Sequence, residues 1–224
     1  MRNLIFIGLA FCVSSALAEH AEVHYFVQVG SSVEFPAGDI NGKTTVSLDS
    51  TLDSSLVPET VGVPNLPVFP VARLRLGSYI DASSISLGFG YGRPLLEEFP
   101  NAVDAPTQHA NWWELDVEYQ YNWLWPGPFR PSFGINYGFW RMQTQDASIS
   151  AHKHPGDVLF SGYAMGLVIG FGWYGIPHFC VRGDLRGRLV SINNLATDVN
   201  DLSELSDPVR DWITGLSLSV QYVF

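Results

Sequence analysis

The sequence predicts an all-β protein, built as one eight-stranded antiparallel up-and-down transmembrane β-barrel. Three observations lead to this fold class. Apolar side chains alternate with small or polar side chains over eight separate stretches, which is the period of a strand with two different faces. The segments that join these stretches alternate between short and long. After the N-terminal segment, no run reaches the roughly 18 consecutive apolar residues that indicate a transmembrane helix.

The first 18 residues have the features of a cleaved signal peptide. Arg2 supplies a positive start, an apolar run over 4–13 follows, and the stretch 16–18 reads Ala-Leu-Ala, a small-residue cleavage site. A membrane anchor is the alternative, but about ten apolar residues are too few to span a bilayer as a helix. We therefore expect a signal peptide over 1–18 and a barrel domain over 19–224.

The eight stretches have lengths suited to crossing a membrane. Several are longer than a typical globular strand of roughly five or six residues, and they match the about 9 to 11 residues that a tilted membrane strand needs. They cover 24–35, 68–79, 84–94, 112–124, 130–141, 159–173, 178–189 and 214–224.

The connections between these stretches form two classes. Short turns containing Gly, Pro and Asp, the residues that tight turns favour, occupy 81–83, 126–128 and 175–177. Long polar segments occupy 36–67, 95–111, 142–158 and 190–213. This alternation is typical of outer-membrane barrels, with short periplasmic turns and long extracellular loops. It places both ends of the barrel domain on the periplasmic side.

The two faces of the strands differ in bulk, and this difference predicts which face lies inside. A soluble lipocalin-like barrel, the alternative, would turn its apolar face inward. One face here carries far more aromatic and aliphatic bulk than an eight-stranded lumen can hold, since such a lumen is just wide enough for side chains to fill. The other face is small, with serines and with Gly88, Gly90, Gly92, Gly134, Gly138, Gly162, Gly166, Gly170 and Gly172. We therefore expect the bulky face to contact lipid.

The small face also carries charged side chains, which we predict to form a lumenal charge network. An unpaired buried charge costs several kcal/mol, so these groups should pair with one another. They could line a pore, but we favour a structural plug of salt bridges because eight strands leave little room for water. The predicted network comprises Glu34, Arg73, Arg75, Glu114, Asp116, Glu118, Arg182, Asp184, Arg186 and Arg188.

Aromatic residues gather near the strand ends, as in the interfacial girdles of membrane barrels. The last strand, "SLSVQYVF", ends on an aromatic residue because its end should lie at the membrane interface and close against the first strand. The predicted girdle comprises Trp112, Trp113, Trp123, Trp125, Trp140, Trp173, Tyr222 and Phe224.

These features together resemble the small eight-stranded outer-membrane barrels of Gram-negative bacteria, of the outer-membrane protein A and X type. The resemblance rests on the segment Met1–Ala18, the alternating connections and the ending "LSLSVQYVF". It implies an outer-membrane location and contact with outer-membrane lipid and lipopolysaccharide. It also implies recognition by the barrel-assembly machinery, with Tyr222 and Phe224 as the signal.

Possible catalytic and metal-binding residues have simpler interpretations. Some barrels of this kind trim lipid acyl chains with a His-x-Ser-Asn-like arrangement; here Ser191 and Asn193 are present, but Leu189 stands where the histidine would be, so the base that a serine nucleophile needs is missing. His152 and His154 could bind a metal weakly, but we favour a solvated loop.

Two further features also have simple interpretations. The acidic segment 196–212 could take a divalent cation but fits no calcium-loop spacing, and we interpret it as a solvated loop. Cys180 is interpreted as a small buried side chain. We expect no catalytic residue, no metal and no cofactor.

Composition narrows the function without defining it. The formal net charge of −10 argues against a nucleic-acid partner, and charged residues make up only 15% of the chain. We expect a non-enzymatic surface protein that contributes to envelope integrity, or that presents its four long loops for adhesion or host contact. A narrow channel for ions or small solutes is the second hypothesis, and a lipid-modifying enzyme is the third.

Overall fold

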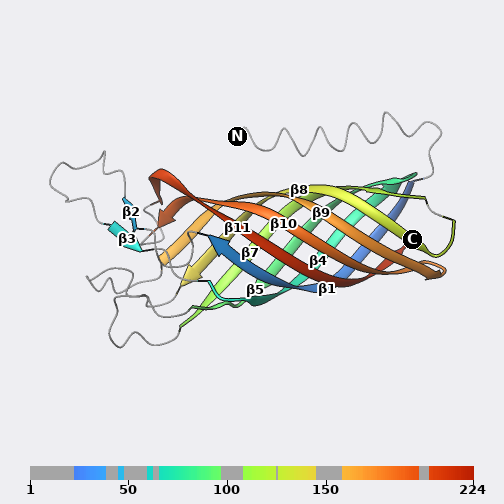
Figure 1. The fold of residues 1–224 in the computed structure, drawn as a ribbon, viewed down its shortest axis with the longest axis horizontal. Coiled ribbons are helices and arrows are strands. Elements are labelled where there is room, and N and C mark those ends of the chain that lie inside the picture. Colours follow the sequence, from blue (N-terminus) through green and yellow to red (C-terminus); the bar gives the residue numbers. More distant parts are fainter. Residues whose placement is uncertain are drawn as a thin grey trace.

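Eight long antiparallel strands close into a barrel in the computed structural model (Figure 1). The structure describes residues 23–38, 45–47, 60–62, 66–96, 108–124, 126–144, 158–196 and 202–224. The barrel strands are β1 (Val23–Gly38), β4 (Phe69–Ile80), β5 (Ser83–Gly92), β7 (Gln108–Asn122), β8 (Phe129–Thr144), β9 (Val158–Ile176), β10 (Phe179–Ala196) and β11 (Leu202–Val223). The short strands β2 (Thr45–Ser47) and β3 (Thr60–Gly62) pair with each other, and β6 (Leu95–Leu96) pairs with β7. No helix among the described residues is long and apolar enough to cross a membrane.

Every barrel strand pairs with its neighbours in sequence, and the first strand pairs with the last. Val29 on β1 lies opposite Leu74 on one side and Val220 of β11 on the other. The backbone N–H of Phe224 donates to the carbonyl oxygen of Tyr25 at 2.8 Å. Closure leaves no open strand edge, which is the condition for a sheet that spans a bilayer. The predicted antiparallel eight-stranded barrel is therefore confirmed.

The short connections all lie at one end of the barrel, here called the turn end. Asp81 and His178 occupy two of these turns and have φ angles of 54° and 65°. The first residue of β1, Val23, lies opposite Ile80 at this same end. The opposite end, here called the loop end, receives the four longer connections.

The strands extend further toward the loop end than the sequence predicted. The predicted loop 190–213 is wrong in most of its length, because β10 continues to Ala196 and β11 begins at Leu202. Val190, Ile192 and Ile213 are buried inside the barrel together with Asp211. The outer face mixes polar residues such as Ser191 and Arg210 with Trp212, and this mixture concealed the alternation. The predicted loops 36–67, 95–111 and 142–158 likewise lose residues at their ends to β1, β6, β7 and β8.

The aliphatic and aromatic face points outward, as predicted. Leu167, Ile169 and Leu218 are 51%, 59% and 64% exposed, whereas the serines and charged side chains of the other face are buried. A soluble carrier would show the reverse arrangement, so the lipocalin-like alternative does not hold. A belt of exposed apolar side chains around a closed barrel is what a bilayer requires.

Glycines on the inner face allow charged side chains to cross the narrow lumen. A Cβ atom placed on Gly88 would lie 2.9 Å from both the Arg75 guanidinium carbon and the Asp116 Oδ1 atom. A side chain at Gly90 would collide with Glu114. The small residues of β5 therefore make room for the charges of β4 and β7.

The outward orientation predicts depth-dependent effects of substitution along β7. Val117 faces outward, midway between Trp113 and Tyr121, so Val117→Arg should lower the free energy of unfolding by about 2–4 kcal/mol. His109→Arg, at the exposed loop end of the same strand, should cost about 0–1 kcal/mol. Denaturant unfolding in lipid vesicles measures both changes. Equal, small effects would show that Val117 does not face hydrocarbon.

Candidate functional site

The interior of the barrel is the candidate functional site, and it has three layers along the axis. A middle layer contains the ten predicted network residues, all of them buried. Toward the loop end, the next inward residues are apolar: Val71 precedes Arg73 on β4, Trp112 precedes Glu114 on β7, and Val190 follows Arg188 on β10. Toward the turn end the buried polar side chains are uncharged: Gln28, Gln120, Asn122, Ser132 and Gln221.

Four side chains at the loop side of the charged layer form a closed ring of ion pairs. Glu34 lies 2.7 Å from Arg73 and 2.8 Å from Arg188. Glu114 lies 2.8 Å from Arg188 and also pairs with Arg73. Each charge of the ring thus contacts two charges of the opposite sign. Because the four residues belong to β1, β4, β7 and β10, the ring ties together strands from around the barrel.

A hydroxyl group adds two hydrogen bonds to this ring. Ser32 Oγ donates to Glu34 Oε1 at 2.7 Å and accepts a bond from Arg73 Nε at 2.7 Å. Ser32 and Glu34 are two residues apart on β1, so both face the lumen. The hydroxyl group therefore helps to orient both charged groups.

The remaining charges form a chain that runs toward the turn end. Arg75 lies 2.6 Å from Asp116 and 3.2 Å from Glu118, and Glu118 lies 3.4 Å from Arg186. Arg186 and Arg182 both contact Asp184, at 4.0 and 3.2 Å. The five carboxylates of the layer thus balance its five arginines. Such mutual pairing offsets part of the cost of burying these groups, although Arg186 Nε and Nη1 have no hydrogen-bond partner.

The chain of charges ends in neutral partners. Arg182 donates to Ser132 Oγ at 2.8 Å and to Asn122 Oδ1 at 3.3 Å, and it also bonds to Gln120. Tyr79, Tyr174 and Gln221 form a further hydrogen-bonded group nearer the turn end. The Arg130 guanidinium lies 4.6 Å from the centre of the Tyr174 ring.

The apolar layer at the loop end includes two residues that the sequence placed in the girdle. Trp112 and Trp140 are buried inside the barrel, and their rings stack at 4.7 Å with an angle of 7°. Their assignment to the lipid-facing girdle is therefore wrong. The signal was available, because Trp112 precedes Glu114 by two residues and must share its face.

Most of the other predicted girdle residues lie on the outer surface of the barrel. Trp113, Trp123, Tyr222 and Phe224 are exposed on the outer surface, and Trp173 is half-buried. Tyr222 packs edge-on against Phe224 at 5.0 Å between ring centres. Trp125 lies outside the described residues.

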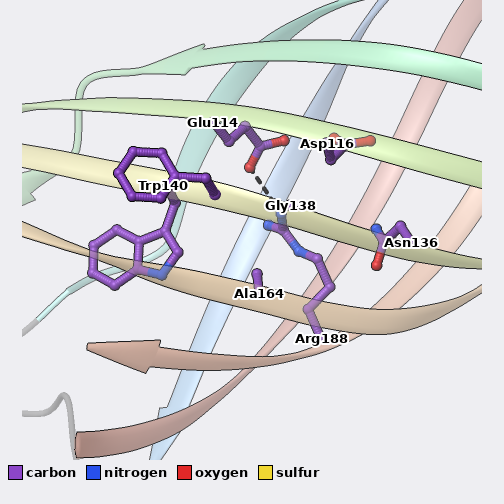
Figure 2. Close-up of a pocket in the computed structure, with 8 residues that line it drawn as sticks. Glu114, Asp116, Asn136, Gly138, Trp140, Ala164 and Arg188 are labelled. Carbon is purple, nitrogen blue, oxygen red and sulfur yellow. Dashed lines mark hydrogen bonds and ion pairs between the residues drawn. The ribbon is translucent and has the colours of Figure 1, made fainter. Parts of the chain in front are cut away.

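A small cavity lies where the charged and apolar layers meet (Figure 2). Its volume is about 10 Å³, roughly the space that one water molecule needs. Four buried polar atoms of its lining residues have no hydrogen-bond partner: Asp116 Oδ2, Asn136 Oδ1, Trp140 Nε1 and Arg188 Nε. The lumen at this level therefore has room for a water molecule but not for a larger solute.

The structure adds little support for the candidate catalytic and metal-binding residues. Ser191 Oγ donates to Asn193 Oδ1 at 2.7 Å, and Leu189 is exposed on the outer face. In the described ranges, no three His, Cys, Asp or Glu side chains gather as a metal site would require. His152 and His154 lie outside the described residues, and Cys180 is a buried free thiol.

One member of the predicted acidic loop is placed differently from the prediction. Asp211 is a buried residue of β11, not part of a solvated loop. The other acidic residues of this segment have side chains that lie outside the described part of the structure: Asp198, Asp201, Glu204 and Asp207.

A closed eight-stranded barrel with an apolar exterior and a filled, charged interior is the arrangement of a small transmembrane β-barrel. Three solved structures share this fold. Neisserial surface protein A has a TM-score of 0.56 at 11% identity, covering 91% of this chain and 99% of its own. The outer membrane protein OprG from Pseudomonas aeruginosa has a TM-score of 0.55 at 11% identity, covering 92% and 97%. The outer membrane protein AlkL, solved in lipid bilayers, has a TM-score of 0.50 at 13% identity, covering 91% and 90%.

These similarities confirm the predicted resemblance at the level of fold. The chain has the fold of the small outer-membrane barrels. No protein-family model matches its sequence, and no curated protein sequence does so either.

The ring of ion pairs predicts that the effects of removing two of its charges on the free energy of unfolding are not additive. Glu34→Gln leaves Arg73 and Arg188 short of a buried partner, so it should lower the free energy of unfolding by about 3–5 kcal/mol. Glu34→Gln combined with Arg188→Gln removes one charge of each sign and keeps the pair of Arg73 with Glu114. The double variant should therefore cost less than the two single variants summed. Denaturant unfolding in vesicles provides the values, and strict additivity would contradict coupling within the ring.

Proposed function

We propose that this protein is a sealed, non-enzymatic outer-membrane barrel whose role is structural and surface-directed. The barrel would anchor the chain, contribute to envelope integrity and hold the connections of its loop end outside the cell for adhesion or host contact. The observation that carries this proposal is the filled lumen. Ten paired charges and an apolar layer occupy the axis along which a solute would have to pass.

Two physical barriers support a closed lumen. In the charged layer, an ion would have to displace partners that already neutralise one another, and separating a buried pair costs several kcal/mol. In the apolar layer, Trp112, Trp140 and Phe160 offer no hydrogen bond across the axis except the long contact from Trp112 Nε1 to Glu114 Oε2 at 3.4 Å. Apolar constrictions of this kind exclude water from channels.

Surface presentation is supported by the asymmetry of the two barrel ends. The turn end has tight connections, whereas all four long connections leave from the loop end. A rigid barrel can hold long loops at a fixed spacing, and binding residues are often found on such loops. The signal peptide over 1–18 and the assembly signal at Tyr222 and Phe224 belong to the same proposal.

A narrow channel is the second candidate, and the cavity beside Trp140 favours it. Unpartnered polar atoms there could solvate a small permeating species. A charged side chain that has two ion-pair partners could also release one of them while it keeps the other. The sealed barrel remains the better supported function, because this cavity holds only about one water molecule.

Planar bilayer recordings separate the two candidates. Purified barrel should give flat current traces in concentrated salt, because neither layer of the lumen offers an aqueous path. A general porin in the same bilayers serves as the positive control, and heat-modifiable gel mobility shows that the inserted protein is folded. Regular conductance steps would overturn the sealed barrel in favour of the channel.

Loop replacement tests surface presentation. Thr144 and Val158 lie directly opposite each other, so an Asn-Gly turn can replace residues 145–157 without altering the register. The variant should keep its heat-modifiable mobility but show reduced adhesion of cells that express it. A scrambled loop of equal length controls for bulk. Unchanged adhesion after replacement of all four loops would contradict this part of the proposal.

A further inference from the structure

The outer surface near the loop end carries an ordered patch on three adjacent strands. Tyr91 on β5, Trp113 on β7 and Arg141 on β8 lie side by side in one row. The row below, toward the turn end, consists of Phe89, Leu115 and Phe139. The change from a purely apolar row to a row with a cation marks the boundary between hydrocarbon and head groups.

A second cation lies one row further toward the loop end. Leu95 pairs with His109 and Gly92 with Trp112, which places Arg93 beside Asn111. Asn111 in turn lies opposite Gln143 of β8. Neighbouring strands are about 4.8 Å apart, and successive residues of a strand are about 3.4 Å apart. Arg93 and Arg141 are separated by two strand spacings across the sheet and two residues along it, so their Cα atoms are about 12 Å apart. Two extended arginine side chains can therefore converge over Asn111.

These arginines differ from the lumenal ones in their surroundings. Both are exposed, and neither forms an ion pair with another residue that the structure describes. None of the described outward residues in these rows is acidic, although the chain as a whole has a net charge of −10. Tyr91 Oη donates to Asn111 Oδ1 at 3.0 Å, which leaves the amide N–H groups as the donors that Asn111 can offer a ligand.

The pairing of an outward arginine with an outward aromatic recurs around the barrel. Among residues with described side chains, the outward-facing arginines are Arg93, Arg141 and Arg210, and all lie at the loop end. Arg210 lies two residues beyond the exposed Trp212 on β11. Aromatic rings prefer the membrane interface and arginines the adjacent phosphate level, so this arrangement suits a phosphate-bearing lipid surface.

We infer that Arg93, Asn111 and Arg141 bind a phosphate group of lipopolysaccharide in the outer leaflet. A phosphate monoester carries a charge of about −1.5 to −2 at neutral pH, which matches two arginines better than the single charge of a phosphodiester does. Arginine forks form paired hydrogen bonds with phosphate oxygens. Tyr91 and Trp113 lie beside Arg141 and one row below Arg93 and Asn111, where they would contact the acyl chains and the sugar.

This inference rests on the proposed orientation, with the loop end outside, but not on a sealed lumen. Conductance would overturn the sealed barrel and leave the lipid site intact. Loss of phosphate selectivity would overturn the lipid site and leave the sealed barrel intact. The two failures are therefore distinguishable.

Lipid binding to the full barrel in detergent micelles tests the site. The probes are lipid A, its dephosphorylated form and phosphatidylglycerol, and the measurement is the Kd of each. The variant R93Q/R141Q should bind lipid A about 25-fold more weakly than wild type, at about fivefold for each arginine. The control R210Q removes one charge on another strand, and it should weaken lipid A binding clearly less than R93Q or R141Q alone, each of which should cost about fivefold. Heat-modifiable mobility confirms that each variant is folded.

Selectivity among the three lipids decides the outcome. Dephosphorylated lipid A should bind wild type and R93Q/R141Q equally. An unchanged Kd of the double variant for lipid A, or equally tight binding of dephosphorylated lipid A to wild type, would overturn the site. An equal loss of phosphatidylglycerol binding would also overturn it, by showing a surface for anionic lipid in general.

Discussion

Closure of the sheet is the constraint on which the rest of this structure depends. A strand edge exposed to hydrocarbon leaves backbone N–H and C=O groups without partners, so β1 must pair with β11. Closing only eight strands gives a lumen just wide enough for side chains. Bulky residues are then forced outward and small residues inward. The apolar belt, the inner glycines and the paired charges all follow from this geometry.

A narrow lumen turns charge pairing into a determinant of register. Glu34 and Glu114 each contact Arg73 and Arg188, which come from strands far apart in the sequence. A slip of one residue in any of these strands would move its charge to the lipid face. The ring therefore penalises wrong pairings more than it stabilises the right one, since buried ion pairs contribute little net stability over apolar packing. The charged interior is better understood as a device for specificity than as a source of stability.

Alternation along the strands predicts the fold class and the lumenal position of the charged residues. Clustering of aromatic residues at the strand ends does not predict which face each of them occupies, whereas alternation does. Trp112 and Trp113 are adjacent in sequence, so they face opposite sides, and only Trp113 lies outside. The ends of β10 and β11 escaped prediction because polar residues such as Ser191 and Arg210 lie on their outer face and Asp211 lies on their inner face. Which arginine pairs with which carboxylate could not be deduced, since it depends on register around the whole barrel.

Polarity changes in opposite directions inside and outside the barrel toward the loop end. On the outer face of β7, the next residue from Leu115 toward the loop end is Trp113. On the inner face, the next residue from Glu114 toward the loop end is Trp112. Inside, an apolar layer thus separates the charged layer from the loop end, while outside, at the same level, the surface becomes cationic. Excluding water from above strengthens the attraction within the charged layer, because the local dielectric is low. The arginines on the outer face, Arg93 and Arg141, have no ion-pair partner among the residues that the structure describes. The same few residues of β7 therefore contribute both to the apolar layer inside the barrel and to the change of polarity on its outer surface.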